Sequence, residues 1–277
     1  MKTEPDDMTG SCKLCNKVEI LKESHVIPDF YIHGLEHKLP TGSKGELQPF
    51  SIVLSADPEM EGGAMQRGYW EKILGIKEYL LCGACEQKFQ RNESYVRDLL
   101  YGNAPPPLKK LSIGSSLNLG IAQPDFDGFL GAKKVIVDYK KLKLFQLSLL
   151  WRAGIAKGSF FKNVDLGEFH SARLRELLHA ENPGLDTDYA CVMIDLQHNG
   201  NGYADWIEAP KRSKDGQVNY QFIIGGYMYL FTVSKQKSRP SAQCCSVKSS
   251  GEIIILVVDA KKLIRSKAAT LHRLGRL

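Results

Sequence analysis

The sequence predicts an α+β protein made of two units, a cysteine-containing N-terminal module and a larger domain with a largely antiparallel sheet. Two Cys-x-x-Cys pairs fall in the first third of the chain, and a strongly apolar helical segment lies near its middle. Strand-like runs follow one another in the last third without regular β–α alternation, which favours antiparallel pairing. With 277 residues, of which 43% are hydrophobic and 25% charged, the chain can form a buried core, which excludes an intrinsically disordered protein.

A turn-rich segment separates the two units. Residues 101–110, YGNAPPPLKK, contain a glycine and three consecutive prolines, which interrupt any helix that reaches them. We therefore expect an N-terminal module over residues 1–103 and a second domain over residues 111–277.

The N-terminal module is predicted to contain two short strands and one helix. Residues 17–28, KVEILKESHVIP, have the pattern of a strand or hairpin arm, and residues 77–82, KEYLLC, that of a second strand. Residues 29–75 are rich in glycine, proline and charge without a sustained period, and are expected to be mostly loop. A helix is expected over residues 82–101, because apolar residues recur there on one helical face.

The second domain is predicted to combine helices with a sheet. Residues 138–156 form a helix so apolar around its circumference that it has to be central, and residues 166–180 form an amphipathic helix that ends before ENPG. A basic helix is expected over residues 261–274. The strand-like runs between these helices cover residues 189–196, 220–233 and 252–260.

The cysteines Cys12, Cys15, Cys82 and Cys85 form the two Cys-x-x-Cys pairs, a spacing that lets two thiolates reach one ion. Because Zn²⁺ prefers four tetrahedral sulfur ligands, the two pairs together predict a closed, structural zinc site. The 66 residues between Cys15 and Cys82 exceed the spacing of an ordinary zinc ribbon, so the ion has to join an early turn to a distant helix. The alternative is two unrelated pairs of reduced core cysteines.

A cysteine knuckle, a strand that ends in Ser-His, a long loop, a second strand and a helix that opens with Cys-x-x-Cys follow one another over residues 12–101. In this order of parts the sequence resembles the HNH endonuclease superfamily in its treble-clef, ββα-metal form with a four-cysteine structural zinc. The resemblance covers about a third of the chain. The motif SHVIP at residues 24–28 stands where the family commonly has Asp-His-Ile followed by proline, which implies that His25 is the general base that activates a water.

The chain departs from the family pattern at three places. Ser24 stands where the family has an acidic metal ligand, Lys77 and Glu78 stand where an Asn is expected, and Glu86 stands where the helix usually carries His. Carboxylates are good ligands for Mg²⁺, so Glu86 and Glu93 are the candidate ligands of a catalytic Mg²⁺ or Mn²⁺. Over most of its length the chain also resembles a group of bacterial HNH-like proteins with SHxIP and LLCxxCE motifs, which implies that Glu86 is a regular feature of that group.

Positive charge is concentrated toward the C-terminus. From residue 231 onward ten Lys or Arg residues stand against two Asp or Glu, which gives +8 there and −2 for the rest of a chain with net charge +6. A basic segment can follow the phosphates of DNA, and the candidate contacts are Lys261, Lys262, Arg265 and Lys267. A solvated helix face is the alternative interpretation of the same residues.

We expect a cytoplasmic protein with no membrane partner. No stretch approaches the roughly 18 to 20 uninterrupted apolar residues of a membrane span, and the acidic N-terminus lacks the pattern of a secretory signal. The leading expectation is a metal-dependent endonuclease that hydrolyses phosphodiester bonds of DNA, with a role in bacterial antiviral defence implied by the resemblance. Its second domain is expected to supply specificity, a protein interface or a homo-oligomer contact. The alternative is a non-catalytic zinc-finger module that binds nucleic acid or a protein partner.

Overall fold

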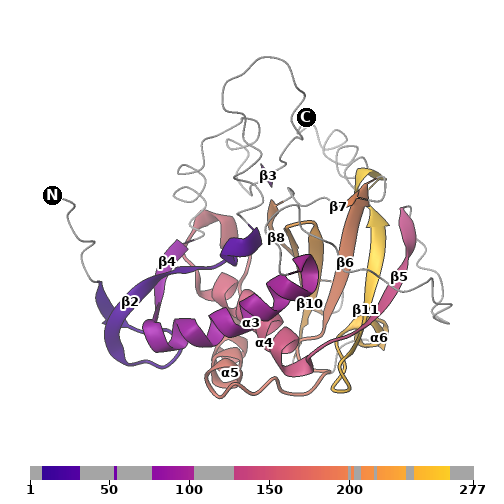
Figure 1. The fold of residues 1–277 in the computed structure, drawn as a ribbon. Coiled ribbons are helices and arrows are strands. Elements are labelled where there is room, and N and C mark those ends of the chain that lie inside the picture. The colour runs from indigo at the N-terminus through magenta and orange to yellow at the C-terminus, as the bar shows by residue number, and fades with distance from the viewer. Residues whose placement is uncertain are drawn as a thin grey trace, which may run out of the picture.

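A computed structural model shows a small sheet and a large sheet with a layer of helices between them (Figure 1). The residues that it describes are 8–31, 53–54, 77–102, 128–198, 201–202, 207–214, 217–234 and 240–262. The chain is therefore of mixed α+β class, as the sequence predicts.

The small sheet contains three strands in the order β1-β2-β4, all antiparallel: β1 Thr9–Ser11, β2 Val18–His25 and β4 Lys77–Cys82. Helix α3, Gly83–Tyr101, starts directly after β4. Its buried side chains recur every three or four residues, as at Phe89, Val96 and Leu100, so one face of the helix packs inward. Both predicted strands and the predicted helix of the N-terminal module are confirmed.

The large sheet is mostly antiparallel, which confirms the expected sheet type. Among the described residues its strands follow the order β3-β8-β9-β10-β6-β11-β5, and only the pairs β11–β6 and β3–β8 are parallel. Their bounds are β3 Val53–Leu54, β5 Phe129–Ile136, β6 Cys191–His198, β8 Ile207–Lys214, β9 Val218–Ile224, β10 Tyr227–Val233 and β11 Glu252–Asp259, with β7 Asn201–Gly202 beside β6.

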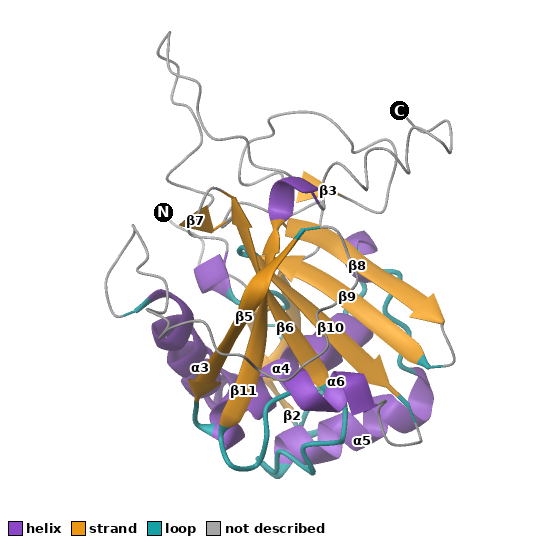
Figure 2. Cartoon of the chain, turned by 90° about the vertical axis from the view of Figure 1, so that its right-hand side faces the viewer, coloured by secondary structure: helices purple, strands orange, loops and turns teal. Residues whose placement is uncertain are grey.

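Helix α4, Tyr139–Ile155, is the centre of the structure, as its apolar sequence predicts. The carboxylate of Asp138 caps its N-terminus by accepting a hydrogen bond of 3.0 Å from the N–H of Lys141. Every residue from 142 to 153 is buried, because α3 and the amphipathic helix α5, Gly167–His179, pack beside α4 and the large sheet lies behind it (Figures 1 and 2).

The two faces of the large sheet belong to two hydrophobic clusters, as the alternation of side chains along a strand requires. On β6, Cys191 and Met193 belong to the cluster that contains α4, whereas Val192 and Ile194 belong to the cluster that contains Cys245 of the short helix α6, Pro240–Cys245. Figure 2 shows α6 on the opposite side of the sheet from α3 and α4. The first cluster includes buried residues from both of the units that the sequence predicts.

Some predictions fall on residues outside the described ranges. Residues 260–262 are helical, which agrees with the start of the predicted C-terminal helix, but residues 263–277 lie outside. The same holds for most of the predicted loop 29–75 and for residues 103–127, which include most of the predicted seam. No helix in the described part of the chain has the length and apolarity needed to cross a membrane.

Gly225 joins β9 to β10 at a point where the N-terminal module packs against the large sheet. Its φ of +58° lies in the left-handed region, and a Cβ added there would lie 2.2 Å from Cδ1 of the buried Tyr31 ring. The carbonyl of Gly225 also accepts a 2.8 Å hydrogen bond from the hydroxyl of Tyr101. These contacts connect residues that are more than 120 positions apart.

We predict that Gly225→Ala lowers the free energy of unfolding by about 2–4 kcal/mol, because left-handed strain adds to a clash with a packed ring. The matched control is Gly167→Ala, since Gly167 has a φ of +64° but nothing within 4 Å of an added Cβ. That control is expected to cost about 1 kcal/mol in a urea titration. Equal losses in the two variants would show that the Tyr31 contact contributes nothing.

Candidate metal centre and the residues beside it

The four cysteines of the two Cys-x-x-Cys pairs lie together, although 66 residues of sequence separate the pairs. Cys12 and Cys15 belong to the turn between β1 and β2, Cys82 is the last residue of β4, and Cys85 lies in the first turn of α3. Their sulfur atoms all lie within 4.8 Å of one another. The predicted clustering is confirmed, and the four thiols are close enough to bind one metal ion.

The turn that carries Cys12 and Cys15 is held by backbone hydrogen bonds. The N–H of Cys12 donates to the carbonyl of Lys17 at 2.9 Å, and Asn16 closes the turn with a φ of +62° and a 2.8 Å bond to the carbonyl of Cys12. The N–H of Lys13 donates to the carbonyl of Leu80 at 2.9 Å, which ties the turn to β4. The first cysteine pair is therefore fixed against the strand that delivers the second pair.

The chemistry of the cluster fits a thiophilic cation. Burial opposes ionisation of Cys12, but hydrogen bonds from the N–H groups of Cys15, Cys82 and Leu14 outweigh it and lower the pKa of the Cys12 thiol to about 7. Burial, together with the neighbouring sulfurs, raises the pKa of the Cys85 thiol well above its ordinary value. Four thiolates this close repel one another strongly, and a bound cation removes that repulsion.

The sulfur spacing agrees with tetrahedral coordination. Four sulfurs at 2.3 Å from one ion are separated by about 3.8 Å in a regular tetrahedron. The Sγ atoms of Cys15 and Cys82 are 3.9 Å apart. None of the seven cysteines forms a disulfide, so all four sulfurs of the cluster can act as ligands.

His25 lies at the end of β2, where the sequence places the candidate base. Its Nε2 atom is shielded from solvent and lies 3.1 Å from Oδ1 of Asp29, an ion-pair distance at which the N–H is not aligned as a hydrogen bond. The side chain of His25 is 23% exposed. The ring nitrogen Nε2 thus faces a carboxylate four residues further along the chain.

Glu86 lies in the first turn of α3, one residue after Cys85, and its carboxylate is bonded to β2. The hydroxyl of the buried Ser24 donates to Oε2 of Glu86 at 2.7 Å. Ser24 directly precedes His25, so this bond fixes the Glu86 carboxylate beside the end of β2. The N-terminal turn of a helix also favours a negative charge.

Glu93 is paired with a residue of the second predicted unit. Its Oε1 lies 2.5 Å from Nη2 of Arg152, a side chain of α4 with no solvent exposure. The same guanidinium donates through Nη1 to the backbone carbonyl of His25 and stacks over the ring of Phe89, with 5.3 Å between Cζ and the ring centroid. Arg152 of α4 therefore contacts both the end of β2 and helix α3.

The three candidate catalytic residues do not form a second metal cluster. In the part of the chain that the structure describes, the four cysteines are the only group of three or more potential ligands whose donor atoms come together. The catalytic Mg²⁺ or Mn²⁺ expected from the sequence is therefore not supported.

Glu78, at the position where the HNH pattern has Asn, accepts hydrogen bonds from the N–H groups of Lys157 and Gly158 at 2.7 and 2.9 Å.

The basic residues predicted to contact nucleic acid are only partly described. Lys261 and Lys262 are exposed at the start of the C-terminal helical segment, where the N–H of Lys261 donates to Oδ1 of Asp259 at 2.9 Å. Arg265 and Lys267 lie outside the described residues.

Two residues near the candidate site were not found from the sequence. Arg152 is a cation within the apolar second half of the central helix, a pattern that indicates a buried ion pair but does not identify the partner. Asp29 lies one turn after His25, and no feature of the sequence distinguishes it from other acidic residues of the following segment.

Comparison of the chain with protein-family models, with curated proteins and with solved structures found no match.

Proposed function

We propose that the chain is a nuclease of the HNH type that hydrolyses phosphodiester bonds of DNA. The observation that carries this proposal is the four-cysteine cluster, which joins the turn before β2 to the start of α3. The Ser24–Glu86 hydrogen bond then joins the end of β2 to the first turn of α3. His25 and Glu86 occupy these two places, one residue from Ser24 and one residue from Cys85 respectively.

In this proposal the cluster binds a structural Zn²⁺ through Cys12, Cys15, Cys82 and Cys85. The hairpin and helix around it then form a treble-clef module, in which the ion replaces the large hydrophobic core that so small a unit lacks. With all four positions taken by sulfur, no position is left for water or substrate. The zinc therefore holds the module together and takes no part in the reaction.

The proposed catalytic step is the transfer of a proton from water to His25. A neutral imidazole that carries its proton on Nε2, the nitrogen 3.1 Å from Oδ1 of Asp29, keeps a lone pair on Nδ1, and Nδ1 is the nitrogen that accepts the proton. The Asp29 carboxylate stabilises the imidazolium that forms, and the hydroxide attacks phosphorus as the bond to the leaving oxygen breaks. Asp29 and the Ser24–Glu86 bond act as positioning contacts around this base.

The proposal contains no step through a catalytic metal, since the described residues hold no second ligand cluster. Glu86 keeps one carboxylate oxygen beyond its bond to Ser24, and Glu93 keeps one beyond its contact with Arg152. Plasmid cleavage with and without added Mg²⁺ or Mn²⁺ tests whether the reaction requires either ion. The exposed Lys261 and Lys262 are proposed as phosphate contacts, and a role in antiviral defence belongs to the same hypothesis.

A second candidate function is a non-catalytic zinc module that binds nucleic acid or a protein partner. One observation favours it: Glu86 and Glu93 each have a partner within the protein, and Arg152 compensates the charge of Glu93. In this alternative, His25 and its neighbours only join the hairpin to α3 and α4.

The test is cleavage of supercoiled plasmid DNA with Mg²⁺, with Mn²⁺ and without added metal. We expect His25→Ala to lower the cleavage rate by about 10²- to 10⁴-fold, the usual contribution of a general base, and Glu86→Ala to lower it as well. Both variants are expected to keep their circular-dichroism spectrum and their zinc.

Glu19→Ala is the matched control, because Glu19 is an exposed carboxylate on the same strand as His25. Its cleavage rate is expected to equal that of the wild type. A wild-type chain that binds DNA without cutting it under any of the three metal conditions would establish the non-catalytic alternative instead.

A further inference from the structure

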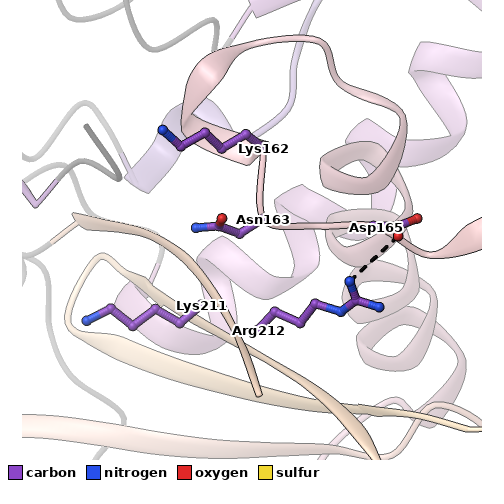
Figure 3. Close-up of a pocket in the computed structure, with 5 residues that line it drawn as sticks. All are labelled: Lys162, Asn163, Asp165, Lys211 and Arg212. Carbon is purple, nitrogen blue, oxygen red and sulfur yellow. Dashed lines mark ion pairs between the residues drawn. The ribbon is translucent and has the colours of Figure 1, made fainter. Parts of the chain in front are cut away.

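A pocket of about 410 Å³ lies between the segment that follows η2, Ser159–Phe161, and strand β8. None of the cluster cysteines or candidate catalytic residues lines it. Its five lining residues are all polar or charged: Lys162, Asn163, Asp165, Lys211 and Arg212 (Figure 3).

The two sides of the pocket are tied to each other by hydrogen bonds. The side-chain amide of Asn163 donates to the carbonyl of Pro210 on β8 at 3.1 Å. The hydroxyl of the buried Tyr220 on β9 donates to the carbonyl of Asp165. Both walls are thus fixed without a ligand, which lowers the entropy that binding costs.

Positive charge dominates the lining. Lys162, Lys211 and Arg212 stand against Asp165, which pairs with Nη1 of Arg212 at 3.6 Å, and against the buried Glu208, which pairs with Lys211. In Figure 3, Lys162, Asn163 and Lys211 extend toward the same side of the pocket, while Arg212 turns to Asp165. Within the described part of the chain, Lys162 has no ion-pair partner.

The lining keeps donors for a ligand. An ammonium has three N–H donors and a guanidinium has five, so the single ion pairs of Lys211 and Arg212 leave most of their donors available. The amide of Asn163 keeps one N–H beyond its bond to Pro210. A polar lining with many donors excludes an apolar ligand and fits an anion that offers several acceptor oxygens.

We propose that this pocket binds a phosphate group of a nucleic acid strand. The final half of β8 supports a polymer over a small anion, because Lys211, Arg212 and Lys214 are all exposed along one continuous strand end. Cations two residues apart on an extended strand, as Arg212 and Lys214 are, lie on the same face about 7 Å apart and can contact successive phosphates. The proposal concerns binding only, so it holds whether or not the chain cleaves DNA.

The test compares two double variants of equal charge. Lys162→Gln/Arg212→Gln removes two cations from the pocket, and the acid partner of Arg212 is exposed, so the fold is retained. Lys140→Gln/Arg173→Gln is the control: it removes one exposed lysine of α4 and one arginine of α5, whose partner Glu176 is also exposed. Binding of fluorescein-labelled single-stranded and duplex DNA is measured by anisotropy over a series of salt concentrations, without added divalent metal.

We expect the pocket variant to weaken binding of one or both DNA forms by about tenfold and to reduce the slope of log K against log salt by about one to two. The control, which carries the same net charge, is expected to change affinity less than about twofold. Equal losses in both variants would overturn the proposal, because they would reflect net charge alone. It would also be overturned if a mononucleotide, and not the oligonucleotides, bound with an affinity that depends on Lys162 and Arg212.

Discussion

Cys82→Ser is expected to remove zinc from the chain and to lower its free energy of unfolding by on the order of 5 kcal/mol. Cys82 joins β4 to α3, and its sulfur lies 3.9 Å from the sulfur of Cys15, which is 67 positions earlier in the sequence. Structural zinc in small modules contributes roughly 10–16 kcal/mol of apparent binding free energy, and three remaining thiolates retain only part of it. Serine matches cysteine in shape, so the loss reports on coordination rather than on packing.

The measurement combines metal analysis of the purified chain with urea unfolding. Wild type is expected to carry about one zinc per chain, as four sulfur ligands complete one tetrahedral site. Cys244→Ser is the control, because Cys244 is exposed and lies outside the cluster. A chelator is expected to destabilise wild type and the control but to leave Cys82→Ser unchanged. A wild-type chain purified without metal, yet equally stable, would refute the zinc assignment.

The helices α3 and α4 were predicted correctly because their apolar residues recur on a helical pattern and are buried. Helix α4 carries apolar residues around most of its circumference and becomes the centre of the core, and helix α3 buries one face. Run 220–233 was expected as a strand-like segment and is two strands, β9 and β10, joined at Gly225 and Gly226. Two consecutive residues with positive φ are what a two-residue hairpin turn requires, and a Gly-Gly pair is its sequence signal.

Strands β5 and β8 were not predicted, and both have a physical reason. In β5 only intermediate and exposed residues occur, and among the described residues it is the last strand of the large sheet on that side. Two lysines also replace the apolar residues that identify a strand. In β8 a proline interrupts the sequence, and the register with β9 shifts between Glu208 and Lys211 around it. Proline is tolerated at such bulges, so the strand depends on its neighbours rather than on its own sequence.

The candidate site likewise combines residues that the sequence predicts with contacts that it does not predict. Cysteine spacing alone predicted the cluster of four cysteines, since two Cys-x-x-Cys pairs have few other uses in a chain of this composition. The contacts of Glu93 and His25 with Arg152 span 59 and 127 residues, and no local pattern carries such information. The pocket between Lys162 and Lys211 was not predicted for the same reason: its walls, joined by the Asn163–Pro210 hydrogen bond across 47 residues, meet only in the folded chain.

Arg152→Met is expected to lower the free energy of unfolding by about 3–5 kcal/mol, because it leaves the Glu93 carboxylate and the His25 carbonyl without their shared donor in a poorly solvated place. Methionine keeps most of the arginine volume, so the loss comes from the lost charge and hydrogen bonds. Arg91→Met is the control, since the pair of Arg91 with Glu181 lies at the surface, and it is expected to cost less than about 1 kcal/mol.

A double-mutant cycle with Glu93→Gln tests whether the two residues act as a unit. If they do, Arg152→Met/Glu93→Gln is less destabilised than the sum of the single variants by about 2 kcal/mol, because the second change removes the charge that the first left unpaired. The result bears directly on the candidate site. A strong coupling means that Glu93 belongs to the ion pair that fixes α3 and the end of β2 against α4, and is a poor metal ligand. A coupling near zero contradicts the ion pair as a stabilising unit and returns Glu93 to the set of carboxylates available beside His25.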